Sequence, residues 1–179
     1  EFIVIGTRQQ LAKVDVDSLC VGHTAILPSS EVRNLGCWVD NQLKMVTQIN
    51  QMCKSAFFHI YNIRRIRKFL NFDNVQTLVN AFVLNRLDYC NSILFGLPNT
   101  ELQKLQRVQN TAARLICNIN KFDHITPTLV KLHWLPVKYR IHFKILLITF
   151  KVIHGLAPKY ISELLTRKKN CNYNLRSTS

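Results

Sequence analysis

Acidic residues are scarce in this chain of 179 residues, which has 10 Asp and Glu against 24 Lys and Arg and a formal net charge of +14. The carboxylates stand apart in the sequence, and the closest pair is Asp15 and Asp17. A two-metal catalytic site needs carboxylates gathered around one cavity, so an enzyme would require this pair to meet a third carboxylate such as Asp40. We therefore expect no catalytic residue and no metal site in this chain.

Glycine-rich loops and closely spaced metal ligands are also missing. The chain has 5 Gly and shows neither a phosphate-binding glycine loop nor a nucleophile elbow. Its 6 Cys, at positions 20, 37, 53, 90, 117 and 171, include no pair at the spacing of about two to four residues that a zinc site requires. We expect the thiols to be reduced and mostly buried, and we expect no cofactor and no small-molecule substrate.

Long uncharged apolar runs are absent as well. The best candidate, residues 141–153, contains Lys144 and Lys151, whereas a membrane-spanning helix needs about 18 predominantly apolar residues. We expect no membrane partner. The sequence does not begin with Met and shows no signal-peptide pattern, so we expect an excised piece of a longer, intracellular protein.

What the chain does have is apolar residues, 47% of the total, in two successive patterns. Short runs ended by turn residues predict strands at 2–5, 14–19, 23–27 and 32–40, which together predict one small antiparallel sheet. In the last strand, Gly36 is expected to leave room for a closely approaching backbone. From about Leu43 the apolar period becomes that of helices and remains so to the end.

The predicted fold class is therefore α+β, with a small N-terminal antiparallel sheet followed by a predominantly α-helical bundle. The predicted regions are 1–42 for the sheet, 43–166 for the helices and 167–179 for a mobile basic tail. Capping boxes are predicted at Asp73 with Gln76 and at Thr100 with Gln103. The most apolar helix, which follows Trp134-Leu135-Pro136 and ends near residue 154, is expected at the centre of the bundle.

The most informative stretch is CKSAFFHIYNIRRIRKFL, residues 53–70. A helix through it buries one apolar face and presents a cationic ridge on the other, with aromatic rings beside it. The ridge consists of Lys54, Tyr61, Arg65 and Lys68, with Phe58 and Phe69 alongside. The alternative is an ordinary polar face in contact with solvent.

A second ridge follows on the helix after Pro98. Lys104, Arg107 and Arg114 share the flank opposite its apolar stripe. Together with the net charge, the two ridges favour a polyanionic partner, with nucleic acid first and an anionic membrane surface second. Cations neutralise phosphates and aromatic rings stack on bases, so we expect both ridges to bind nucleic acid.

Arg86 falls inside the predicted apolar arc of its helix, where an unpaired charge is unfavourable. Its guanidinium is expected to extend to solvent, to pair with a carboxylate such as Asp88, or to reach a ligand phosphate.

Several blocks of the sequence together resemble the C-terminal part of the reverse transcriptases of non-LTR (LINE-type) retrotransposons. EFIVIG at 1–6 is similar to the strand that ends the palm, and NLGCWVD at 34–40 to the hairpin called the primer grip. Residues 53–70, RLDYCNSILFGLP at 86–98, LQRVQNTAARL at 105–115 and the segment 124–158 are similar to successive blocks of the thumb and beyond. The resemblance covers nearly the whole chain.

The resemblance implies a non-catalytic fragment of an RNA-directed DNA polymerase. It implies a primer-grip role for Leu35, Gly36 and Trp38, and a grip on an RNA template or RNA–DNA duplex for the basic helices. In the family, the aspartates that hold Mg²⁺ lie before the point where this chain begins, so Mg²⁺ is expected only for the complete polymerase and the fragment is expected to be inactive alone. The missing palm and fingers are expected partners, and the parent element implies a place in cytoplasm and nucleus. The alternative is an inert or repurposed remnant that acts as a protein-interaction module, with an apolar surface around Phe2, Ile5 and Trp38.

Overall fold

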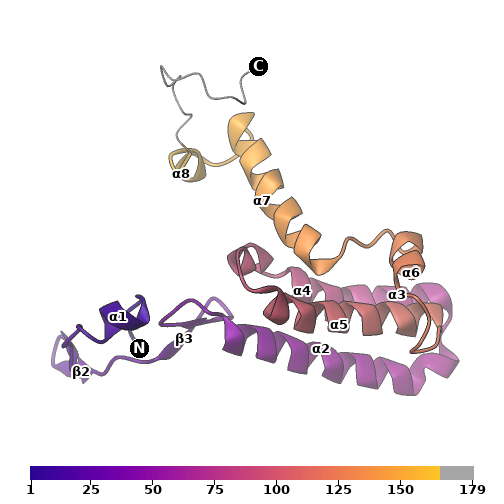
Figure 1. Cartoon of the computed structure of the whole chain (residues 1–179), viewed down its shortest axis with the longest axis horizontal. Coiled ribbons are helices and arrows are strands. Elements are labelled where there is room, and N and C mark those ends of the chain that lie inside the picture. The colour runs from indigo at the N-terminus through magenta and orange to yellow at the C-terminus, as the bar shows by residue number, and fades with distance from the viewer. Residues whose placement is uncertain (166–179) are drawn as a thin grey trace. The chain divides into compact units, whose positions relative to one another are not determined.

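The computed structural model describes residues 1–165, and the chain forms two compact units, Glu1–Ile141 and His142–Ser179. Two separate antiparallel sheets occupy the N-terminal part and helices follow, which confirms the α+β class. The first unit includes both the strands and most of the helices (Figure 1). The predicted tail at 167–179 lies outside the described residues.

The N-terminal strands differ from the prediction of one sheet. β1 (Leu19–Val21) pairs with β2 (Thr24–Ile26), and β3 (Glu31–Asn34) pairs with β4 (Cys37–Asp40). The stretch 2–5 forms only one bridge, from Phe2 to Pro28, and most of 14–19 is not a strand. Instead a short helix, α1 (Arg8–Leu11), begins at a capping box between Thr7 and Gln10 that the sequence analysis missed.

The predicted strand 32–40 is a hairpin. Asn34 pairs with Cys37, so Leu35 and Gly36 form a two-residue turn with φ values of 46° and 85°. Such a turn needs positive φ at both central residues, which glycine adopts freely and leucine does not. A Cβ on Gly36 would meet nothing closer than Tyr89 Cε1 at 3.8 Å, so the glycine is required by its φ and not by a close backbone.

The helices begin at α2 (Val46–Ile66), which a short 3₁₀ turn, η1 (Arg67–Phe69), extends. Then come α3 (Phe72–Val79), a π turn η2 (Asn80–Leu84), α4 (Asn85–Asp88), a 3₁₀ turn η3 (Asn91–Leu94), α5 (Asn99–Cys117), α6 (Thr126–Lys131), α7 (Val137–Ile153) and α8 (Lys159–Ser162). Both predicted capping boxes are wrong. Asn71, not Asp73, caps α3 by accepting from Asn74 N, and α5 begins after Pro98 without a side-chain cap.

The core of the first unit lies between α2 and α5, which run side by side (Figure 1). Their buried apolar residues are Ile49, Met52, Ala56, Ile60 and Ile63 on α2 and Leu105, Val108, Ala112, Ala113 and Ile116 on α5. Each fully buried large side chain contributes about 1.5–3 kcal/mol. The three alanines are fully buried and let the two backbones approach closely.

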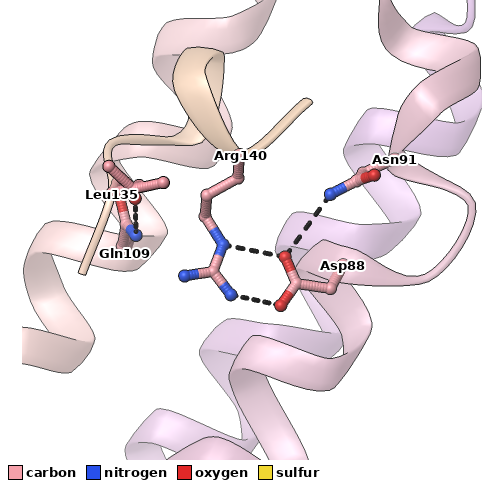
Figure 2. Close-up of polar contacts among 5 residues, drawn as sticks. All are labelled: Asp88, Asn91, Gln109, Leu135 and Arg140. Carbon is pink, nitrogen blue, oxygen red and sulfur yellow. Dashed lines mark hydrogen bonds and ion pairs between the residues drawn. The ribbon is translucent and has the colours of Figure 1, made fainter. Parts of the chain in front are cut away.

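Two polar contacts attach the beginning of α7 and the segment before it to α4 and α5 (Figure 2). The Arg140 guanidinium pairs with the Asp88 carboxylate through both of its oxygens. Gln109, fully buried on α5, donates from Nε2 to the Leu135 carbonyl at 2.8 Å and accepts from Gln106 Nε2 at 2.9 Å. A buried amide satisfied on both sides fixes this connection more specifically than apolar packing does.

The sequence predicted that the apolar helix α7 lies at the centre of the bundle, and this prediction is wrong. Its buried residues are Val137 and Ile141, at its beginning. In the second unit the described part comprises the rest of α7 and α8, where Phe150 packs on the His154 ring at 4.1 Å between centroids. The central position belongs to α2 and α5 because the buried residues of the first unit concentrate on them.

Replacing Gln109 by Leu is expected to lower the free energy of unfolding by about 1–3 kcal/mol, because the Leu135 carbonyl and the Gln106 amide lose a buried partner. Urea unfolding followed by circular dichroism measures the change. Gln103→Leu, at an exposed position of the same helix, is the matched control and should change stability by less than about 0.5 kcal/mol. Equal midpoints for the two variants would contradict the structural role of Gln109.

Candidate nucleic-acid interface

A basic groove of about 890 Å³ opens where α2 and α5 end. The two helices run parallel, since Arg67 at the end of α2 bonds the last carbonyls of α5 while Lys104 near the start of α5 lies close enough to Cys53 to influence its thiol. Parallel packing brings both C-terminal ends to one place. The cations that line the groove are Arg64, Arg65, Arg67, Lys68, Arg107, Arg114 and Lys121.

The charge of this groove is uncompensated. Seven of its thirteen lining residues are Lys or Arg, and none is acidic. Among residues 1–165, none of these seven cations forms an ion pair, whereas three ion pairs form elsewhere. Asn110, Thr111 and Asn118 add neutral hydrogen-bonding groups to the walls. The lining suits an anion with several oxygen acceptors.

Arg67 has a structural role in this groove. Its guanidinium donates to the carbonyls of Leu115 at 3.1 Å, Ile116 at 3.1 Å and Leu70 at 2.9 Å. The carbonyls at a helix end lack partners within the helix and carry partial negative charge, so a cation there is stabilising. Arg67 therefore joins the end of α5 to the end of α2.

Arg114 is half-buried in the groove wall and only partly satisfied. Its Nη2 donates to the Asp123 carbonyl at 3.2 Å, and its Nε is buried without a hydrogen-bond partner. The Asp123 carboxylate instead accepts from the Asn120 main-chain N–H. Arg114 is thus oriented by the loop after α5 while keeping unused donor capacity.

Four of the seven residues predicted to bind nucleic acid line this one groove: Arg65 and Lys68 from the first ridge, and Arg107 and Arg114 from the second. The structure therefore brings the two predicted ridges together at their C-terminal ends. Lys54, Tyr61 and Lys104 lie outside it.

The three residues outside the groove differ in their environments. Lys54 and Tyr61 are exposed on α2. The Lys104 ammonium pairs with Glu101 at 2.8 Å, which neutralises its charge. Burial raises the pKa of the neighbouring Cys53 thiol, and the Lys104 charge opposes this shift.

Three groove cations were not predicted. Arg64 lies beside the predicted ridge on α2, and Lys121 follows the left-handed residue Asn118, where α5 ends. Arg67 falls near the apolar arc of α2, a position that sequence periodicity assigns to the core. The charge run RRIRK at 64–68 was the available signal for Arg64 and Arg67.

A second groove, of about 600 Å³, lies beside the β3–β4 hairpin and is called the hairpin groove here. Of the predicted primer-grip residues, Gly36 and Trp38 line it, and Leu35 at the turn is 83% exposed. Gln48 on α2 holds the hairpin by accepting from Trp38 N at 2.9 Å. The Leu35 carbonyl accepts from the Tyr89 hydroxyl at 2.5 Å.

Arg86 lines the hairpin groove and is exposed, so its guanidinium extends to solvent, and its contact with a ligand phosphate stays a prediction. Asp88 pairs with Arg140 instead. Burial, and then the Arg86 charge, lower the pKa of His59, whose ring stacks on Phe82 at 5.2 Å.

The carboxylates predicted to matter for an enzyme do not meet. Asp40 accepts from Lys44 N at 2.9 Å and Met45 N at 2.6 Å and so orders the start of α2, whereas Asp15 and Asp17 lie on the exposed stretch before β1. Within residues 1–165 there is no group of three or more His, Cys, Asp or Glu side chains placed to hold a metal ion.

No helix in the described part of the chain is long and apolar enough to cross a membrane. Comparison of the chain with protein-family models, with curated proteins and with solved structures gave no match.

Arg67→Lys is expected to lower the free energy of unfolding by about 1–3 kcal/mol, because one ammonium cannot bond three carbonyls in the geometry that the guanidinium fits. Arg64→Lys, the same substitution three residues before Arg67 at an exposed position, should have little effect. Chemical unfolding of both variants measures the difference. If both changed stability equally, Arg67 would not be the residue that joins the two helix ends.

Proposed function

We propose that this chain is the thumb-side, non-catalytic part of a retrotransposon reverse transcriptase, and that its basic groove holds an RNA template or RNA–DNA duplex. The observation that carries the proposal is the groove itself, where seven cations and no carboxylate gather at the ends of α2 and α5. The family assignment rests on the resemblance of the sequence blocks.

Cations at helix C-termini also stabilise the helices, so the groove cations have two explanations: stabilisation of the helix ends and binding of a polyanion. The size of the positive charge decides between them. Each helix end is equivalent to about half a negative charge, and two ends sum to about one. Arg67 already bonds these carbonyls. The remaining cations, which include Arg65, Lys68 and Arg107, therefore leave a large positive excess that a polyanion would neutralise.

The contacts proposed are with phosphate and sugar, which position the strands without reading their sequence. Such binding releases counterions and therefore weakens steeply as salt rises. Mg²⁺, the palm and the fingers belong to the complete polymerase in this proposal, which places the parent protein in cytoplasm and nucleus.

A second candidate is a remnant whose uncovered apolar residues bind another protein. The observation that favours it is the exposure of apolar side chains in the N-terminal part, where Ile5 is 52% exposed, Val21 59% and Leu27 71%. Phe2 and Trp38 are only half-buried. A missing palm would cover the same surface, so this observation fits both candidates.

The double variant Arg65→Ala and Arg107→Ala is expected to weaken binding to a short RNA–DNA hybrid about equally across sequences. It should also flatten the dependence of log affinity on log salt by about one unit per lost phosphate contact, or about two in total. Fluorescence anisotropy titrations at several salt concentrations measure both quantities.

The matched control is Arg8→Ala with Lys138→Ala, which removes the same charge at exposed positions outside the groove. Heparin serves as a competitor without base pairs or a defined duplex shape. An unchanged salt slope in the groove variant, or equal losses in both variants, would remove these arginines from the interface. Equal affinity of the chain for hybrid and heparin would overturn the proposed function.

A further inference from the structure

Two segments far apart in the sequence meet beside the hairpin groove: the tip of the β3–β4 hairpin and the corner between α4 and η3. The Tyr89 hydroxyl donates to the Leu35 carbonyl at 2.5 Å, and the Tyr89 ring lies against Gly36. The next residue after each of these contacts is a cysteine, Cys37 on β4 and Cys90 at the corner.

The two thiols lie close to each other, since Cys37 follows Gly36 and Cys90 follows Tyr89 at this contact and the two side chains interact. The Cys37 sulfur also accepts from Gln48 Nε2 at 3.9 Å. Burial, together with the interaction with Cys90, raises the pKa of Cys37 to about 11. Cys37 is only 6% exposed, and its raised pKa makes the thiol unreactive toward reagents in solution. It can react when a reagent is first bound to the neighbouring Cys90.

Cys90 supplies that access. It is exposed, in contrast to the prediction that most thiols are buried, and it occupies a left-handed corner with φ of 52°. Cys90 therefore lies in a turn between α4 and η3, and its exposed thiol is accessible to reagents. Cys20, which is also exposed, lies on β1 in the other two-stranded sheet and provides a comparison.

We propose that Cys37 and Cys90 form a redox-active dithiol that a low-molecular-weight disulfide, such as glutathione disulfide, converts to an intramolecular disulfide. The Cys90 thiolate attacks one sulfur of the reagent, which forms a mixed disulfide and releases one glutathione thiolate. The Cys37 thiolate then attacks the Cys90 sulfur and releases the second glutathione. In total, two protein thiols are oxidised to one disulfide and one glutathione disulfide is reduced to two glutathione thiols, which take up the two protons that the protein thiols lose.

The Cys37–Cys90 disulfide would link the tip of the β3–β4 hairpin covalently to the corner between α4 and η3. At present the Tyr89 hydroxyl and Gln48 hold the hairpin through hydrogen bonds, of which the Tyr89 bond is exposed and therefore opens and closes readily. A covalent link fixes the wall of the hairpin groove that carries Gly36 and Trp38. The dithiol would thus make the position of the hairpin depend on the oxidant.

The test treats the full-length chain with glutathione disulfide, blocks the remaining thiols with N-ethylmaleimide and maps the peptides by mass spectrometry. The expected product joins the peptides of Cys37 and Cys90, while Cys20 carries a stable glutathione adduct because it has no neighbouring thiol. Retention of glutathione on Cys90 in the unaltered protein would overturn the proposal, as would Cys37–Cys90 linkage no more abundant than other pairings.

Two variants define the order of the steps. In Cys37→Ser the glutathione adduct on Cys90 should persist, and in Cys90→Ser the thiol at Cys37 should remain free at times when Cys20 has reacted. Faster reaction of Cys37 than of Cys20 in Cys90→Ser would overturn the assigned order. The peptide map of the unaltered chain needs no variant, so the proposal is decided even where a substitution prevents folding.

Discussion

The contact on which the basic groove depends is the bond between Arg67 and the last carbonyls of α5. It holds two parallel helices at their C-terminal ends, where their dipoles would otherwise repel. Buried alanines, Ala56, Ala112 and Ala113, make the approach possible, and the arginine makes it stable. The same arrangement collects several other cations of both helices at one site, because the basic run 64–68 ends α2 and Arg107 and Arg114 lie on the side of α5 that faces it. The groove is thus a consequence of how these two helices pack.

Under the proposed function, this origin would make the groove select a ligand by charge more than by shape. Its cations are on long flexible side chains, and within residues 1–165 only those of Arg67 and Arg114 form hydrogen bonds to the protein. Flexible cations follow a phosphate backbone without fixing a base, which suits the proposed contacts with phosphate and sugar. A ligand that reads sequence would need rigid donors at base edges, and the neutral side chains here, such as Asn110 and Thr111, are few.

Sequence periodicity predicted which face of α2 is buried, and it placed Arg65, Lys68, Arg107 and Arg114 on basic flanks because charge and helical spacing are local properties. It did not predict that the flanks meet, since the parallel direction of α2 and α5 arises from long-range packing. The apolar pattern predicted one strand over 32–40 and missed the hairpin turn, which only the resemblance of 34–40 implied. Leucine is unfavourable at positive φ, and only the distant Tyr89 hydroxyl shows how Leu35 is held there.

The two grooves lie on opposite flanks of α2. At about 100° per residue, Gln51 and Ser55 in the hairpin groove point away from Arg64 and Lys68 in the basic groove, with the buried face on one side between them. The exposed back of α2 lies on the other side, and there stand Lys54, Phe58, Tyr61 and Arg65. A nucleic acid that occupies both grooves has to cross this back, where cations and exposed rings alternate. The ridge residues outside the basic groove, Lys54 and Tyr61, therefore lie between the two grooves, on the path that a nucleic acid would take under the proposed function.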